Sequence, residues 1–230
     1  MIQKDYIMRM VEQLAQVLTK IIFNKENKNY EEAIKQINSG FKGLLGLDLE
    51  VIQSLSDQEI IQLFKIGENF ELEKCLFIAK LLKEEAEISE LKKEEKSKYL
   101  MTYQKSLSLF IEVILHNESP ELEDCTKDIE SILNRIKKYE SPSDLKFKIF
   151  QYYELTGQYA NAENILFELS DTGYPNIISI GEAFYSRLRN KSDEELNKGN
   201  LPRTELIEGL EEFKKLSTCS CKQTHILRKK

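Results

Sequence analysis

The sequence predicts an all-α fold of about nine to twelve helices, arranged as an irregular α-α superhelix or a helical bundle. Apolar residues recur at steps of three and four along most of the chain, and alternating patterns of any length, which are typical of β-strands, are absent. Only 9 Gly and 4 Pro occur among 230 residues, which favours long elements joined by few turns. A hydrophobic content of 41% is sufficient for a substantial core.

The first predicted helix has the clearest apolar stripe. Its apolar positions are Ile2, Tyr6, Ile7, Met10, Leu14, Val17, Leu18, Ile21 and Ile22. The opposite face carries Lys4, Arg9, Glu12, Gln16 and Lys20. A break at NKENKN ends this helix, and a second helix follows through Tyr30, Ala33, Ile34 and Ile37. The glycines at 40, 43 and 46 predict a fraying helix end and a turn.

The middle of the chain contains a helix start and a strongly charged segment. Ser56 followed by Glu59 is a capping-box pattern, and the next helix is expected from near Phe70. Residues 83–98 are almost purely charged, with Glu and Lys at helical spacing. This pattern predicts a solvated helix or a helical linker between two halves of the chain.

The second half repeats the same kind of signal. An apolar stripe runs from Tyr99 to Ile114, and Ser-Pro pairs at 119–120 and 141–142 indicate helix starts. Pro175, Pro202 and a capping box at Ser192 predict further starts. We therefore expect an N-terminal helical region (1–90), a second helical region (91–216) and a disordered polar and basic tail (217–230).

Residues 154–170 have the pattern of a turn and the second helix of a helical hairpin. Gly157 permits a tight turn, Tyr159 fills the wedge between two helices, and Ala162 allows the backbones to approach closely. This stretch resembles the second half of a tetratricopeptide repeat. Phe150 and Leu169 depart from the repeat pattern, which prefers small residues there. Steps of 34 residues in either direction give no recognisable copy, although Tyr30 and Ala33 keep the Tyr-x-x-Ala spacing. The second helical region, 91–216, is thus predicted to be tetratricopeptide-like and not a regular array.

The opening MIQKDYIMRMVEQLAQVL is similar to the start of an uncharacterised family of cytoplasmic proteins from Gram-positive bacteria, a domain of unknown function. The resemblance implies a bacterial origin and a helical, repeat-like fold. It implies no activity, ligand or catalytic residue.

Charge and composition argue against several classes of partner. The net charge is −6 with both signs mixed along the chain, so nucleic acid is not an expected partner. No uncharged apolar run approaches the ~18 residues of a membrane helix, and charges interrupt any signal-peptide core at the start. We expect a cytoplasmic protein without membrane association. Cys75 and Cys125 fall in helical stretches and are interpreted as reduced core residues.

Sequence patterns for catalysis or cofactor binding are missing. Phosphate-binding glycine loops, zinc-protease motifs, EF-hand loops and serine-hydrolase elbows do not occur. Glu84, Glu85, Glu94 and Glu95 are interpreted as solvated carboxylates. In the tail, Cys219, Cys221 and His225 are weak candidates for a zinc or copper site, because three ligands do not close a tetrahedral site. We expect no cofactor and no enzymatic activity.

These observations predict a protein-interaction or adaptor module whose partner is another protein or peptide. If the hairpin belongs to a superhelix, the resemblance places Phe147, Gln151 and Glu154 on the ligand-facing side of its first helix. One alternative is an intracellular regulator that senses a small peptide in a helical concavity, which a deep interior pocket would favour. A second is an enzyme of unrecognised type, which clustered buried carboxylates in one cleft would favour.

Overall fold

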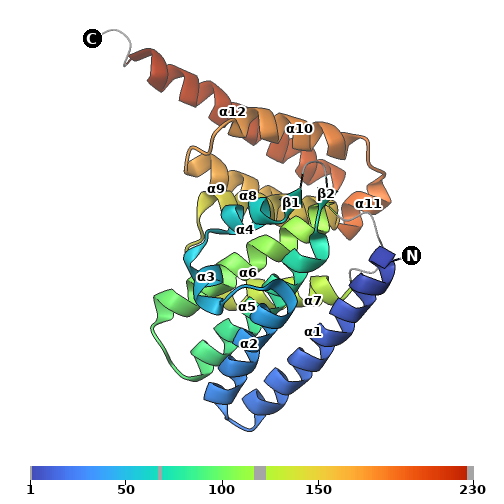
Figure 1. The fold of residues 1–230 in the computed structure, drawn as a ribbon. Coiled ribbons are helices and arrows are strands. Elements are labelled where there is room, and N and C mark those ends of the chain that lie inside the picture. Colours follow the sequence, from blue (N-terminus) through green and yellow to red (C-terminus); the bar gives the residue numbers. More distant parts are fainter. Residues whose placement is uncertain (1, 67–68, 117–122, 227–230) are drawn as a thin grey trace. The chain divides into compact units, whose positions relative to one another are not determined.

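The structure is a computed structural model that describes the backbone of residues 2–66, 69–116 and 123–226 and the side chains of 8–65, 71–116 and 125–215. Within these residues the chain forms twelve helices (Figure 1), which confirms the predicted all-α fold. The short pair β1 (Lys65–Ile66) and β2 (Asn69–Phe70) is antiparallel, with Lys65 opposite Phe70. The chain divides into two compact units, 1–140 and 141–230.

Unit 1 (residues 1–140) is built around two long helices, α5 (Leu72–Leu91) and α6 (Lys96–His116), which form an antiparallel hairpin. A second hairpin, α1 (Ile2–Glu26) with α2 (Tyr30–Leu45), packs on α5, and α7 (Glu123–Ile136) packs on α6. The short helices α3 (Leu49–Ser54) and α4 (Asp57–Leu63) contact α2 and α6, respectively. The core centres on α5 and α6, whose fully buried apolar residues include Ile78, Leu81, Leu107, Phe110 and Ile111.

Unit 2 (residues 141–230) begins with the predicted hairpin, α8 (Ser143–Leu155) and α9 (Tyr159–Asp171). Helix α10 (Ile177–Arg189) packs on α9 and α12 (Arg203–Ile226), and the short α11 (Asp193–Lys198) packs on α12. Tyr159, Ala162 and Leu166 are buried in the core of this unit, as the hairpin interpretation predicts. Phe150 and Leu169, which depart from the repeat pattern, are buried too, and the Phe150 ring packs edge-on against Phe184 of α10.

Both predicted capping boxes are present. Ser56 accepts a hydrogen bond from the Glu59 amide at the start of α4, and the Glu59 carboxylate accepts one from the Ser56 amide. The same reciprocal pair joins Ser192 and Glu195 at the start of α11. The Ser119–Pro120 start lies outside the described residues.

Among the described residues, five inter-helix turns share one backbone arrangement. In each, a residue with positive φ follows the helix. The amide of this residue donates a hydrogen bond to the carbonyl three residues earlier, and the amide of the next residue donates one to the carbonyl five residues before it. The positive-φ residues are Lys28, Lys93, Gly157, Gly173 and Asn200. This pattern is the Schellman motif, which satisfies the last carbonyls of a helix. The turn at Lys28-x-Tyr30 therefore has the backbone of the Gly157-x-Tyr159 turn, although lysine replaces glycine.

Three predictions about element boundaries differ from the structure. Gly40 and Gly43 lie inside α2, which ends at Leu45 with Gly46 in the left-handed conformation, because Gly40 packs closely on Val17. The expected boundary at 90/91 falls in the α5–α6 hairpin, whereas the units divide at 140/141. The expected tail, 217–230, overlaps the end of α12, and its side chains lie outside the described ones.

The predicted solvated segment 83–98 also differs from the structure. Residues 83–91 form the second half of α5, and Glu84 and Glu85 are only 6% and 3% exposed. These charges are tolerated inside unit 1 because other helices supply partners for them, as described below.

Candidate docking surface

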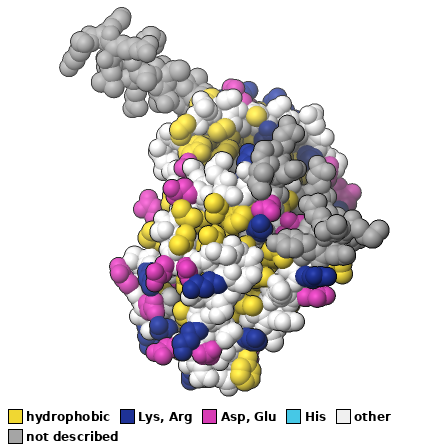
Figure 2. Space-filling model, viewed as in Figure 1, with side chains coloured by type: hydrophobic (Ala, Val, Ile, Leu, Met, Phe, Trp, Pro, Cys, Tyr) yellow, Lys and Arg dark blue, Asp and Glu magenta, His cyan; other side chains and the backbone are white. Residues whose placement is uncertain are grey.

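Helix α1 has two apolar faces, and only one of them is buried. Met10, Leu14 and Ile21 are buried in unit 1. A second row of apolar residues lies further round the same helix, and its members Met8, Val11 and Ile22 are 54%, 49% and 41% exposed. Exposed hydrophobic side chains are also visible among charged ones on the face of the molecule in Figure 2.

The exposed row has heptad spacing. Its residues follow one another at steps of three, four, three and four, and we call them the α1 stripe: Met8, Val11, Ala15, Leu18 and Ile22. Ala15 is exposed and Leu18 is half-buried. This spacing keeps side chains on one line of a helix and is the pattern with which one helix packs along another. Phe23, further round the same helix, is 63% exposed.

A network of charges anchors α1 to the rest of unit 1. Lys25, near the end of α1, donates to Glu84 at 2.5 Å and to Glu87 at 2.6 Å, both on α5. Burial alone would lower the pKa of Lys25, but the hydrogen bonds to these two carboxylates outweigh it and raise that pKa. Lys25 therefore stays charged, and the end of α1 is fixed while its stripe remains exposed.

The same network continues across α5 to α7. Lys80 and Lys83 pair with Asp128 at 3.0 and 2.9 Å, and Arg135 pairs with Glu90 at 2.5 Å. Tyr103 of α6 donates its hydroxyl proton to Glu90 at 2.9 Å. Four cations thus face four carboxylates, and the network joins α1, α5, α6 and α7. This balance is typical of a structural ion-pair network.

Glu85 lies on another face of α5 from Glu84 and has a different partner. Gln53 of α3 donates to its Oε1, while Oε2 is a buried oxygen without a hydrogen-bond partner among the described residues. Burial raises the pKa of Glu85, and Gln53 and two lysines offset this only in part. Since Glu84 and Glu85 contact different helices, the two buried carboxyls do not form an acid–base pair in one cleft.

A hollow of about 180 Å³ is lined by Gln53, Leu82, Lys98, Met101, Thr102 and Lys105. Lys105 is not available to a ligand there, because its ammonium donates to the carbonyls of Ile52 at 3.2 Å, Gln53 at 2.9 Å and Leu55. It caps the C-terminal end of α3, where a cation is favourable. The volume is smaller than the ~300 Å³ at which ligand pockets begin.

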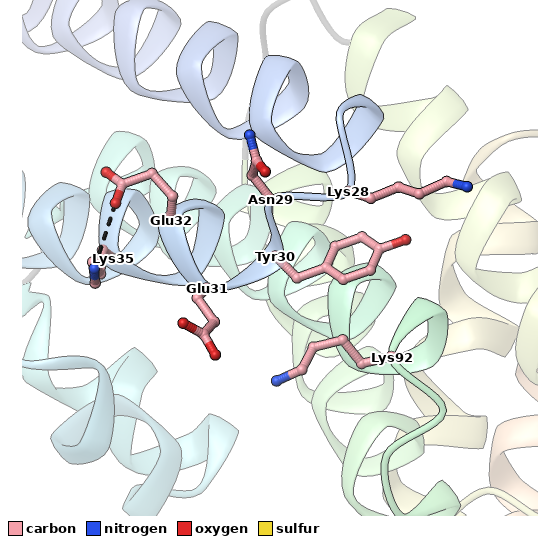
Figure 3. A pocket seen from close by; sticks show the side chains of 7 residues that line it. All are labelled: Lys28, Asn29, Tyr30, Glu31, Glu32, Lys35 and Lys92. Carbon is pink, nitrogen blue, oxygen red and sulfur yellow. Dashed lines mark ion pairs between the residues drawn. The ribbon is translucent and has the colours of Figure 1, made fainter.

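A wider hollow of about 500 Å³ lies at the α1–α2 turn (Figure 3) and is lined by Lys28, Asn29, Tyr30, Glu31, Glu32, Lys35 and Lys92. The Tyr30 ring lies between the side chains of Lys28 and Lys92. Lys35 pairs with Glu32 at 3.6 Å, and Lys92 pairs with Glu94 at 2.7 Å. Because these charges are exposed and of both signs, the hollow does not select for one class of ligand.

The residues predicted to face a partner, Phe147, Gln151 and Glu154, lie on α8 in unit 2, and all three are half-buried. The Phe147 ring stacks on Tyr174 with a centroid distance of 5.3 Å. Glu154 accepts two hydrogen bonds from Arg187 of α10. Phe147 and Glu154 are therefore engaged within unit 2, and their role in partner binding stays a prediction.

The candidate metal ligands Cys219, Cys221 and His225 lie outside the described side chains. Elsewhere, across the side chains that the structure describes, no three His, Cys, Asp or Glu residues are grouped so as to hold a metal ion. No helix among the described residues combines the length and apolar character needed to cross a membrane.

Comparison with protein-family models gives a match over most of the chain. A family model described as a family of unknown function (DUF6483) matches residues 1–218. The chain belongs to this family. The match confirms the predicted membership of an uncharacterised family. The matched residues include α1 and all of unit 1. Searches of curated proteins and of solved structures returned no match.

The α1 stripe was missed because the sequence pattern was interpreted as one broad apolar face. The predicted apolar face includes Leu18 and Ile22, which the core does not bury, and leaves out the exposed Met8, Val11 and Phe23. The signal was present in the width of the apolar arc, since a helix that buries only one side needs roughly 100° of apolar surface. An arc that is wider than this indicates a second contact.

Proposed function

We propose that this DUF6483 chain is a non-enzymatic protein-interaction module that binds a helix of another polypeptide along the α1 stripe. One observation carries this proposal: α1 buries one apolar face in the core of unit 1 and exposes a second apolar row at heptad spacing, the α1 stripe. Contiguous exposed apolar patches of a few hundred Å² on a folded chain are often functional.

The geometry of the stripe supports a helical partner over an extended one. Side chains at heptad spacing form a line along the helix, into which the ridge of a second helix packs. An extended peptide bound by strand addition would need an exposed sheet edge, and the β1–β2 pair has two residues per strand. Anchoring of α1 through Lys25 supports a preformed surface, which reduces the entropy lost on binding.

Peptide sensing has less support from the described part of the chain. The apolar hollow beside Lys98 and Met101 holds about 180 Å³, which does not accommodate a peptide of several residues. The predicted ligand-facing residues Phe147 and Glu154 are occupied by Tyr174 and Arg187.

A matched set of variants tests the proposal. Val11→Glu with Ile22→Glu adds two negative charges in the stripe, whereas Gln13→Glu with Gln16→Glu adds two outside the stripe on the same helix, where both residues are exposed. Partners captured by the wild type are identified, purified and titrated against each variant. Burial of one such side chain is worth about 1.5–3 kcal/mol, so the stripe variant should bind at least about tenfold more weakly.

The control variant should bind its partner like the wild type, and circular dichroism should show equal helix content in all three proteins. Equal affinity of the stripe variant would contradict the proposal. The variant Phe147→Ala/Glu154→Ala is titrated in parallel, and a loss of binding confined to it would place the partner on unit 2 instead.

A further inference from the structure

The α1 stripe has a sequence that suits pairing with itself. In an antiparallel pair of heptad helices, residues whose numbers add up to a constant face each other. When that constant is 33, Val11 faces Ile22 of the second copy and Ala15 faces Leu18 of the second copy. Each layer then contains one larger and one smaller side chain, which is how facing helices interdigitate.

A parallel pair of the same helices packs less well. Each residue would then face its own copy, so Ala15 would meet Ala15 and leave a gap, while Leu18 would meet Leu18. Voids of this kind forfeit dispersion contacts on both sides. In the antiparallel pair, the flanking Glu12 comes near Thr19 of the second copy, so no like charges meet beside the central layers.

The size of the surface indicates a weak, reversible contact. Met8, Val11 and Ile22, at 54%, 49% and 41% exposure, present with Ala15 and Leu18 an apolar area on the order of 300 Å², less than half of what one partner contributes to a standard interface. Polar residues beside the stripe, such as Glu12 and Thr19, supply additional contact area. A closed two-fold pair would bury the same central residues, Val11, Ala15, Leu18 and Ile22, of both copies.

We propose that a second copy of this chain occupies the α1 stripe, with the two α1 helices antiparallel about a two-fold axis between Ala15 and Leu18. This inference rests on the proposed function, since it names the helix that the stripe binds. The dimer forms reversibly as concentration rises, because the interface lies at the small end of the range for specific contacts.

Disulfide trapping tests the orientation directly. The background protein carries Cys219→Ser and Cys221→Ser, and the remaining Cys75 and Cys125 are buried. In the double variant Val11→Cys/Ile22→Cys, the introduced thiols at 11 and 22 of opposite copies meet, and mild oxidation should convert most of the protein to a covalent dimer. The single variants should give little dimer, because two copies of either position lie eleven residues apart along the pair. Gln13→Cys/Lys20→Cys serves as the off-stripe control.

Efficient cross-linking of the single variants would indicate a parallel pair and overturn the proposal. Absence of cross-linking in the double variant would also overturn it. Sedimentation equilibrium separates this failure from that of the proposed function. A wild-type mass that stays monomeric at all concentrations, while a foreign helix still binds in a Val11-dependent way, would refute the dimer and leave the interaction module intact. If the variant Val11→Glu/Ile22→Glu still dimerises, the dimer interface lies elsewhere and the proposed pairing of the α1 helices is refuted.

Discussion

Glu154 on α8 accepts two hydrogen bonds from the guanidinium of Arg187 on α10, at 2.6 and 2.9 Å. The pair has fork geometry, and Glu154 is mostly buried while Arg187 is about half exposed. It joins the predicted hairpin to the next helix of unit 2. A residue expected to face a partner thus has an internal role.

A double-mutant cycle measures this role. Glu154→Gln, Arg187→Met and the double variant should show a coupling energy of about 0.5–1 kcal/mol in urea unfolding, since exposure of Arg187 screens the pair. A control cycle on the exposed pair Lys198 and Glu194 should give less. No coupling between Glu154 and Arg187 would show that the pair does not hold α10 on α8.

The shared turn geometry predicts opposite effects for two substitutions. Lys28 and Gly157 occupy the same left-handed position, with φ of 61° and 75°. Lys28→Gly should stabilise the protein by about 0.5–1 kcal/mol, and Gly157→Ala should destabilise it by about 1 kcal/mol. Denaturant unfolding checks both. Two changes of the same sign would mean that positive φ does not control stability at these turns.

The buried carboxyl of Glu85 should make the free energy of unfolding depend on pH. Burial raises its pKa in the folded protein, so over the range between the unfolded and folded values the unfolded state binds fewer protons. Stability therefore falls as pH rises through that range, and the cost is absent below the unfolded pKa of about 4.3. Glu85→Gln keeps the bond from Gln53 and cannot ionise. It should be more stable than the wild type at neutral pH, and the gain should vanish in acid.

Thermal unfolding at several pH values checks this expectation, with Glu50→Gln of α3 as the control because Glu50 is exposed. A gain that is equal at all pH values would contradict the role of ionisation. A gain in Glu50→Gln of the same size would show that the effect is not specific to the buried carboxyl.

Removing the ammonium group of Lys105 should destabilise the protein, because that group bonds to backbone carbonyls. Its ammonium caps the end of α3 through the carbonyls of Ile52, Gln53 and Leu55. Lys105→Met keeps the apolar stem and should cost about 1–2 kcal/mol in urea unfolding, because charge-assisted hydrogen bonds are lost. Lys98→Met, an exposed lysine on the same helix, should change stability by less than about 0.5 kcal/mol. Equal effects would refute the cap.

Local signals predicted much of the fold. The capping boxes at Ser56 and Ser192 and the wedge formed by Gly157, Tyr159 and Ala162 depend on residues close in sequence, so their chemistry is visible in the chain. The tetratricopeptide-like character of the hairpin stays a prediction.

Long-range partners were not predictable in the same way. Glu84 and Glu85 resemble surface residues because the groups that permit their burial, Lys25 and Gln53, lie 59 and 32 residues away. The unit boundary was misplaced for the same reason, since a charged segment looked like a linker. The α1 stripe required knowledge of which apolar residues the core uses, and only the packed structure supplies it.

Site-specific photo-cross-linking tests the central claim, that the α1 stripe is a docking surface, most directly. A photoreactive side chain at Val11 is compared with one at Gln13, an exposed residue on the other side of the same helix. Cross-linked products, located by mass spectrometry, should form at Val11 and contain a helical segment, with far fewer at Gln13. Equal yields at the two positions, or no product at Val11, would contradict the claim.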